Sequence, residues 1–212
     1  GVSGECSIYT GTASAGDTGF IALTTGEATK GKGGYVHVYV GEGDTSVGGE
    51  VAVIAGKTTD HATGGLIKML TGYSTPTSSG TFTIDTANAG KEGVSGGIHL
   101  DTGTSSYGNP GMITFTTGRA NEGHGRDIRH LVGTCNKGDG GDGMLTAGET
   151  TEDAKIGGDV VVTGGLGSST DNKNGGNGGK VQIFGGEAKG QEINIDWGGN
   201  VEVGGGRGAT ST

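Results

Sequence analysis

Residues 34–41 read Gly-Tyr-Val-His-Val-Tyr-Val-Gly, and residues 49–56 read Gly-Glu-Val-Ala-Val-Ile-Ala-Gly. Both segments begin and end with glycine, and both place valine at the third and fifth positions. Apolar residues at alternate positions, with β-branched side chains on one face, indicate a β-strand. A glycine directly after the alternation suits a sharp corner.

The same frame recurs along almost the whole chain at a spacing of about 15 residues. Thirteen copies begin at Gly4, Gly19, Gly34, Gly49, Gly65, Gly80, Gly96, Gly111, Arg126, Gly141, Gly158, Gly179 and Gly199. One short strand cannot bury its own apolar face, whereas a stack of them in register can. The sequence therefore predicts an all-β fold: a narrow parallel β-solenoid of about 13 coils of about 15 residues, forming one domain over residues 1–212. At about 4.8 Å per coil, such a rod would be roughly 60 Å long.

Two parts of the array depart from this regular unit. Residues 126–157 are expected to form irregular coils, because Arg126 replaces the leading glycine, His130 takes an inward apolar position and Gly143 stands where valine is usual. Residues 158–212 are expected to form longer coils. A shift of 92 residues also aligns Ala55-Gly56-Lys57-Thr58-Thr59 with Ala147-Gly148-Glu149-Thr150-Thr151, which indicates that a block of six coils was duplicated.

Composition narrows the classes of function. The chain has 52 glycines and 2 prolines in 212 residues, with a net charge of −9. Too few prolines and no Gly-X-Y phase exclude collagen. The negative balance argues against nucleic-acid binding, which needs clustered Lys and Arg. No apolar run approaches the ~18 residues that cross a bilayer, so no membrane span is expected.

The repeat Ser/Gly-Gly-x-Val/Ile-x-Val/Leu-x-Thr-Gly resembles Gly-rich repeat regions of secreted and cell-surface proteins from diatoms and related algae. Residues 79–84 and 178–186 are typical segments, and the resemblance runs from Ser3 to Gly206. It is a resemblance to a repeat style that contains no catalytic motif. It implies an extracellular or cell-surface location and a structural role.

Candidate chemical sites are few, and each has a structural interpretation. Cys6 and Cys135 occupy inward positions about nine coils apart, so they are expected to be small core residues, with a disulfide between neighbouring molecules as the alternative. His130 and Cys135 share one coil, flanked by His124, but zinc needs three or four ligands. Residues 139–143 and 172–179 are faintly like calcium-binding Gly/Asp repeats, yet they lack the nine-residue period and are interpreted as turns.

We therefore expect no enzymatic activity, no catalytic, cofactor-binding or metal-binding residues and no cofactor. The leading hypothesis is a structural rod or filament subunit that assembles head-to-tail, because a solenoid without capping elements exposes unpaired strand edges at its ends. An ice-binding solenoid is one alternative, although the outward positions form no regular threonine array. Binding of extracellular polysaccharide by an adhesin is the other, through the exposed tyrosines Tyr9, Tyr35, Tyr39, Tyr73 and Tyr107.

Overall fold

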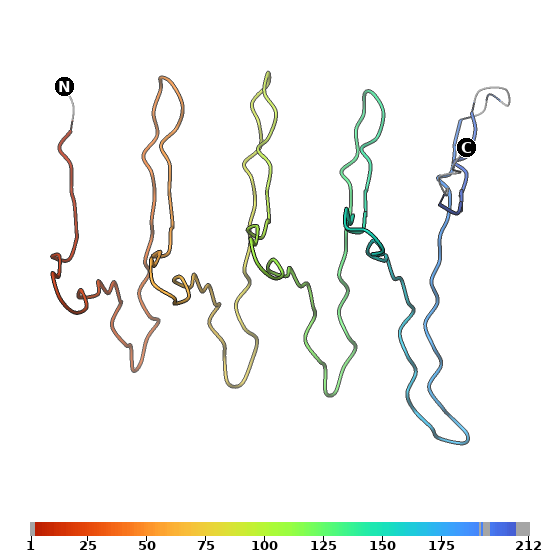
Figure 1. The fold of residues 1–212 in the computed structure, drawn as a ribbon, viewed down its shortest axis with the longest axis horizontal. Coiled ribbons are helices and arrows are strands. Elements are labelled where there is room, and N and C mark those ends of the chain that lie inside the picture. Colours follow the sequence, from red (N-terminus) through yellow and green to blue (C-terminus); the bar gives the residue numbers. More distant parts are fainter. Residues whose placement is uncertain (1–2, 191, 193–195, 207–212) are drawn as a thin grey trace. The chain divides into compact units, whose positions relative to one another are not determined.

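The computed structural model describes residues 3–190, 192 and 196–206, and within these ranges the chain forms no helix and no β-strand. Figure 1 accordingly draws thin loops without coiled ribbons or arrows. The prediction of an all-β parallel solenoid is therefore wrong. The repeats are present as a sequence pattern, but their extended segments do not pair into a sheet.

The backbone hydrogen bonds also show that the repeats do not form a solenoid. Folded proteins make about one internal hydrogen bond per residue, most of them between backbone groups. Eight backbone-to-backbone bonds occur among the described residues. A parallel ladder needs several such bonds between every pair of neighbouring coils, so these eight cannot constitute one.

Solvent exposure supports the same conclusion. The accessible surface is 22385 Å² for a chain of 20.7 kDa. A compact monomer of this mass exposes about 8,900 Å², and a fully unfolded chain about 30,000 Å². No side chain in the described part of the chain is buried. The inward positions of the predicted coils therefore enclose no core.

The chain divides into two units, Gly1–Leu100 and Asp101–Thr212. The division lies close to Gly96, the residue that a 92-residue shift of Gly4 reaches. Each unit thus corresponds approximately to one copy of the duplicated block, with the longer repeats added to the second.

A recurring hydrogen bond links consecutive repeats within each unit. The N–H of a repeat's first glycine donates to the carbonyl of the eighth-position glycine in the preceding repeat, and we call this closure the neck. It occurs as Gly65 to Gly56 (2.8 Å), Gly80 to Gly72 (2.9 Å), Gly158 to Gly148 (2.9 Å), Gly179 to Gly165 (2.8 Å) and Gly199 to Gly186 (2.8 Å). The neck keeps its length while the number of residues between its two glycines changes, so the longer repeats carry their insertions in the loop that the neck closes.

The first-position glycine of a repeat also lies against the seventh-position residue of the preceding repeat. A methyl group on Gly65 would come within 3.3 Å of the Ala55 Cβ, and one on Gly111 within 3.3 Å of Thr102. Ala55 and its counterpart Ala147 are among the few half-buried residues. A side chain at the first position would thus collide at these repeats, which explains the glycine there.

The segments between the eighth-position residue of one repeat and the first residue of the next contain the left-handed residues, and of these only Ala154 lies in a loop that a neck closes. Among the described residues, positive φ angles occur at Gly16 (92°), Ser46 (65°), Gly108 (92°), Gly138 (90°) and Ala154 (58°). Gly16 and Gly108 are related by the 92-residue shift, and so are Ser46 and Gly138. At these two pairs of positions the backbone has the same left-handed conformation in both copies of the block. At position 46, however, a serine occupies a conformation that favours glycine.

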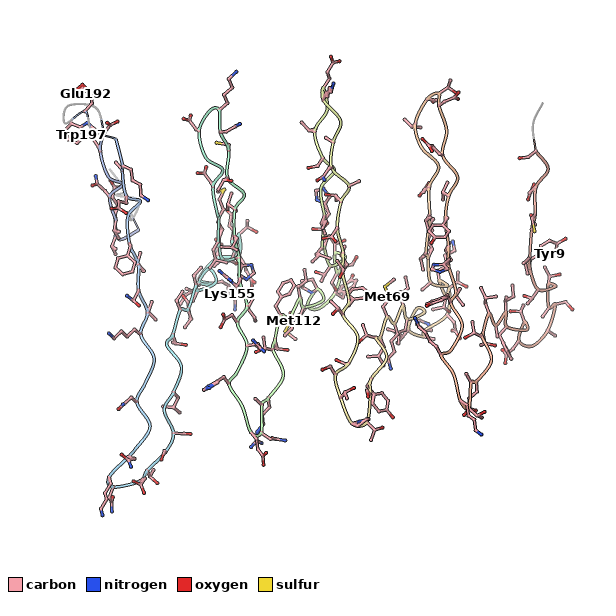
Figure 2. The ribbon with its side chains drawn as sticks, turned by 180° about the vertical axis from the view of Figure 1, so that it is seen from behind. Tyr9, Met69, Met112, Lys155, Glu192 and Trp197 are labelled. Carbon is pink, nitrogen blue, oxygen red and sulfur yellow. The ribbon has the colours of Figure 1, made fainter. Side chains whose placement is uncertain are left out.

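Exposure follows the alternation along a repeat only in part. The large apolar side chains at the third position are 48–58% exposed and those at the even positions 65–89%, but those at the fifth position span 57–93%. Figure 2 shows side chains standing off the ribbon, among them Tyr9, Met69 and Met112, without gathering into a core. The third-position side chains are thus less exposed than those at even positions, but none of them is buried.

Candidate functional site

A group of aromatic side chains in mutual contact occupies the second, fourth and sixth repeat positions of residues 34–41. In an extended segment, residues two apart project to the same side, which brings Tyr35, His37 and Tyr39 into one row. The ring centroids of Tyr35 and His37 are 5.5 Å apart, and those of His37 and Tyr39 are 5.4 Å apart. The second pair of rings is nearly parallel, at 14°. We call Lys32, Tyr35, His37 and Tyr39 the aromatic row.

Polar contacts join the members of the aromatic row. The Tyr39 hydroxyl lies 3.2 Å from His37 Nδ1. The Lys32 ammonium lies 4.7 Å from the centroid of the Tyr35 ring, within the range of a cation–π interaction, and it also donates to the Tyr35 hydroxyl. Tyr35 is accordingly the least exposed of the large side chains at even positions. Each ring is held by a neighbour on at least one side.

The other three tyrosines named in the sequence analysis stand alone. Tyr9, Tyr73 and Tyr107 are 82%, 84% and 97% exposed, and none makes a ring contact within the described part of the chain. Figure 2 labels Tyr9 projecting from the ribbon. Five tyrosines were candidates for carbohydrate contact, and the structure combines two of them, Tyr35 and Tyr39.

The candidate Cys/His pair in residues 126–157 does not form a metal centre. The Cys135 thiol donates to the carbonyl oxygens of Gly138 and Asp139, each at 3.3 Å. His130 instead lines a pocket of about 370 Å³ with Gly143, Met144 and Leu145. Within the described ranges, no three His, Cys, Asp or Glu side chains are placed to hold a metal ion, His124 included.

Both cysteines are free and exposed, so the expectation that Cys6 and Cys135 are small core residues is wrong. The physical reason is that the coils do not stack into a sheet, so a residue at an inward position of the repeat faces solvent. A disulfide between molecules stays a prediction.

The segment 172–179 belongs to a loop organised by the preceding aspartate. The backbone N–H groups of Asn174 and Lys173 donate to Asp171 Oδ1 at 2.7 and 2.9 Å. These two bonds, the one from Asn174 foremost, lower the pKa of the Asp171 carboxyl below its usual value. The Gly176 N–H closes the loop on the Ser169 carbonyl at 3.1 Å. This carboxylate therefore serves as a local acceptor for the turn.

Sequence reasoning missed two members of the aromatic row, Lys32 and His37. The repeat pattern alone does not connect His37 with the tyrosines on either side of it. The usable signal was the spacing Tyr-x-His-x-Tyr, because any extended conformation puts these three rings on one side.

Comparison with protein-family models, with characterised proteins and with solved structures finds no match for this chain. In the ranges that the structure describes, no helix has the length and apolarity needed to cross a membrane.

Proposed function

We propose that this chain is a non-catalytic structural repeat protein of a cell surface or extracellular matrix, and that it acts by associating with further copies of itself. The observation that carries the proposal is the exposure of the same apolar positions in repeat after repeat. Apolar side chains that their own chain leaves uncovered gain free energy when a partner buries them. Resemblance to Gly-rich repeats of algal cell-surface proteins supports the location.

The energetics favour an array over a single contact. Completely burying a Val or Ile side chain contributes about 1.5–3 kcal/mol, so a residue that is half exposed has about 1 kcal/mol still to gain. Association costs on the order of 4–15 kcal/mol in lost freedom. One repeat therefore cannot hold two chains together. The eleven large apolar side chains at third positions, with a combined gain of about 10 kcal/mol, are of the right order to do so.

Another copy of this chain is the partner that fits. It carries apolar residues at the same repeat positions and at the same period, so a contact made at one repeat can be repeated at the next. If the contact joins different registers of two copies, it does not close and it generates an open fibre. The sequence-based argument for head-to-tail assembly relied on the ends of a solenoid, whereas the present proposal rests on the exposed faces.

Paired sets of substitutions test the proposal. One set introduces aspartate at third positions of three consecutive repeats (Val36→Asp, Val51→Asp, Ile67→Asp). The control set adds the same charge at even positions that carry no large apolar side chain (Ala52→Asp, Thr81→Asp, Thr83→Asp). Sedimentation velocity over a concentration series, with negative-stain microscopy, should show assemblies of the wild type and of the control set, and a marked shift towards monomer for the first set.

Two outcomes contradict the proposal. If both sets shift the assembly equilibrium equally, charge and not the third-position face is responsible. If the wild type is strictly monomeric at every concentration and also produces thermal hysteresis in freezing solutions, the ice-binding alternative replaces the structural role.

A further inference from the structure

We propose that the aromatic row binds an anionic polysaccharide, a polymer whose sugar rings carry carboxylate or sulfate groups. The site is distinct from the third-position face used for self-association, because Tyr35, His37 and Tyr39 occupy the even positions of their repeat. The two functions can therefore operate on opposite sides of the same segment.

Preorganisation is the first argument. Ring contacts at 5.5 and 5.4 Å, the Tyr39–His37 contact and the Lys32 ammonium over Tyr35 restrict all four side chains before any ligand arrives. Side chains that are already ordered lose less entropy on binding. Aromatic residues add a large contact area at a small rotamer cost, which is why they dominate many binding surfaces.

The chemistry of the row fits sugars. The C–H groups on one side of a pyranose ring pack against an aromatic ring, while its hydroxyls need hydrogen-bonding partners close by. Tyrosine supplies an apolar ring with a polar end, and the His37 imidazole can donate or accept. A row of three rings along an extended segment favours a polymer over an isolated sugar, because an extended polymer can follow the row from Tyr35 to Tyr39.

Charge selects an anionic polymer. Residues 28–41 contain Lys30 and Lys32 and no Asp or Glu, and Glu27 and Glu42 border this segment at its two ends, so the positive charge lies at the Lys32 end of the row. Lys32 is fixed at the start of the row by its contacts with Tyr35. Ammonium-to-carboxylate and ammonium-to-sulfate hydrogen bonds are stronger than neutral ones, so a charged group on the ligand has a defined partner at that end.

Affinity electrophoresis of the full-length protein tests the site. Gels containing polygalacturonate or dextran sulfate should retard the wild type, whereas gels containing neutral dextran should not. The double variant Tyr35→Ala/Tyr39→Ala should bind roughly tenfold more weakly. Tyr9→Ala is the matched control, since Tyr9 occupies the same repeat position as Tyr39 and is equally exposed at 82%. All these side chains are exposed, so circular dichroism should be unchanged.

A second variant tests the charge. Lys32→Gln should remove most of the preference for charged over neutral polymer and should flatten the salt dependence of binding. Retardation by one anionic polymer alone identifies carboxylate or sulfate as the recognised group.

Three results would overturn the proposal. The first is no retardation of the wild type by either anionic polymer. The second is equal loss of binding in the double variant and in Tyr9→Ala, which removes the row as the site. The third is equally tight binding of polyglutamate, which shows that charge alone acts and that no sugar is recognised.

Discussion

Alanine at position 65 tests whether the neck between repeats is a real constraint. A methyl group there would lie 3.1 Å from Gly56 N, 3.2 Å from Gly56 O and 3.3 Å from the Ala55 Cβ, all closer than ordinary van der Waals contact. Gly56 O is also the acceptor of the Gly65 N–H at 2.8 Å. Relieving the collision separates donor from acceptor and costs about 1 kcal/mol, the net contribution of one such hydrogen bond.

A loss of about 1 kcal/mol corresponds to roughly a fivefold higher population of open loops. Hydrogen–deuterium exchange followed by NMR should therefore show a protection factor for the residue 65 amide about fivefold lower in Gly65→Ala than in the wild type. Gly64→Ala is the matched control, because its methyl group would meet its nearest neighbour, Gly56 O, at an ordinary 3.7 Å.

The same reasoning predicts how strongly alanine weakens the necks at Gly158 and Gly80. The methyl group would come within 3.3 Å of a backbone atom at Gly158 and no closer than 3.6 Å to any atom at Gly80. Loss of protection should therefore decrease in the order Gly65, Gly158, Gly80. Equal protection of the residue 65 amide in Gly65→Ala and Gly64→Ala would refute the neck as a steric constraint.

Two other predictions concern the loops. Ser46→Gly should slow amide exchange in the 41–49 loop, because a serine at a φ of 65° has a conformational cost of about 1–2 kcal/mol. Gly138→Ser, at the equivalent position, should accelerate exchange in its own loop. Unchanged rates in both variants would contradict this reasoning. Asp171 accepts two backbone hydrogen bonds as a carboxylate, so its pKa is lower in the ordered loop than the usual 3.8. Its contribution to the loop is therefore fully present above about pH 3.8 and is lost as the pH falls through the lowered pKa. Amide shifts of Lys173 and Asn174 should follow this titration and should be insensitive to pH in Asp171→Asn.

The period of the repeat could be predicted from the sequence, but the fold could not. Glycine at the first and eighth positions determines where the chain can close on itself, and the observed necks join these positions. Alternation at residues such as Val36 and Val38 indicates an extended, two-faced segment. It does not specify which segment pairs with it, because register depends on a buried face that these glycine-rich repeats do not provide.

The candidate site was partly predictable for a related reason. Exposed tyrosines can be identified from their outward positions, so Tyr35 and Tyr39 were found. Which tyrosine gains a neighbour depends on residues two or three positions away, and Lys32 and His37 were not connected with them. His130 and Cys135 would share one coil of a solenoid. Without a solenoid, Cys135 donates to nearby carbonyl groups and His130 lines a separate pocket.

The neck has a consequence for how this chain tolerates change. Gly72 and Gly80 close a loop eight residues on, and Gly165 and Gly179 close one fourteen residues on, with hydrogen bonds of 2.9 and 2.8 Å. Loop-closure entropy rises slowly with length, so this difference costs only about 0.5 kcal/mol. The loops that a neck closes can therefore accept inserted or deleted residues at little cost, with the neck hydrogen bond unchanged. A foreign peptide could therefore be inserted into a loop that a neck closes without breaking the hydrogen bond at the base of that loop.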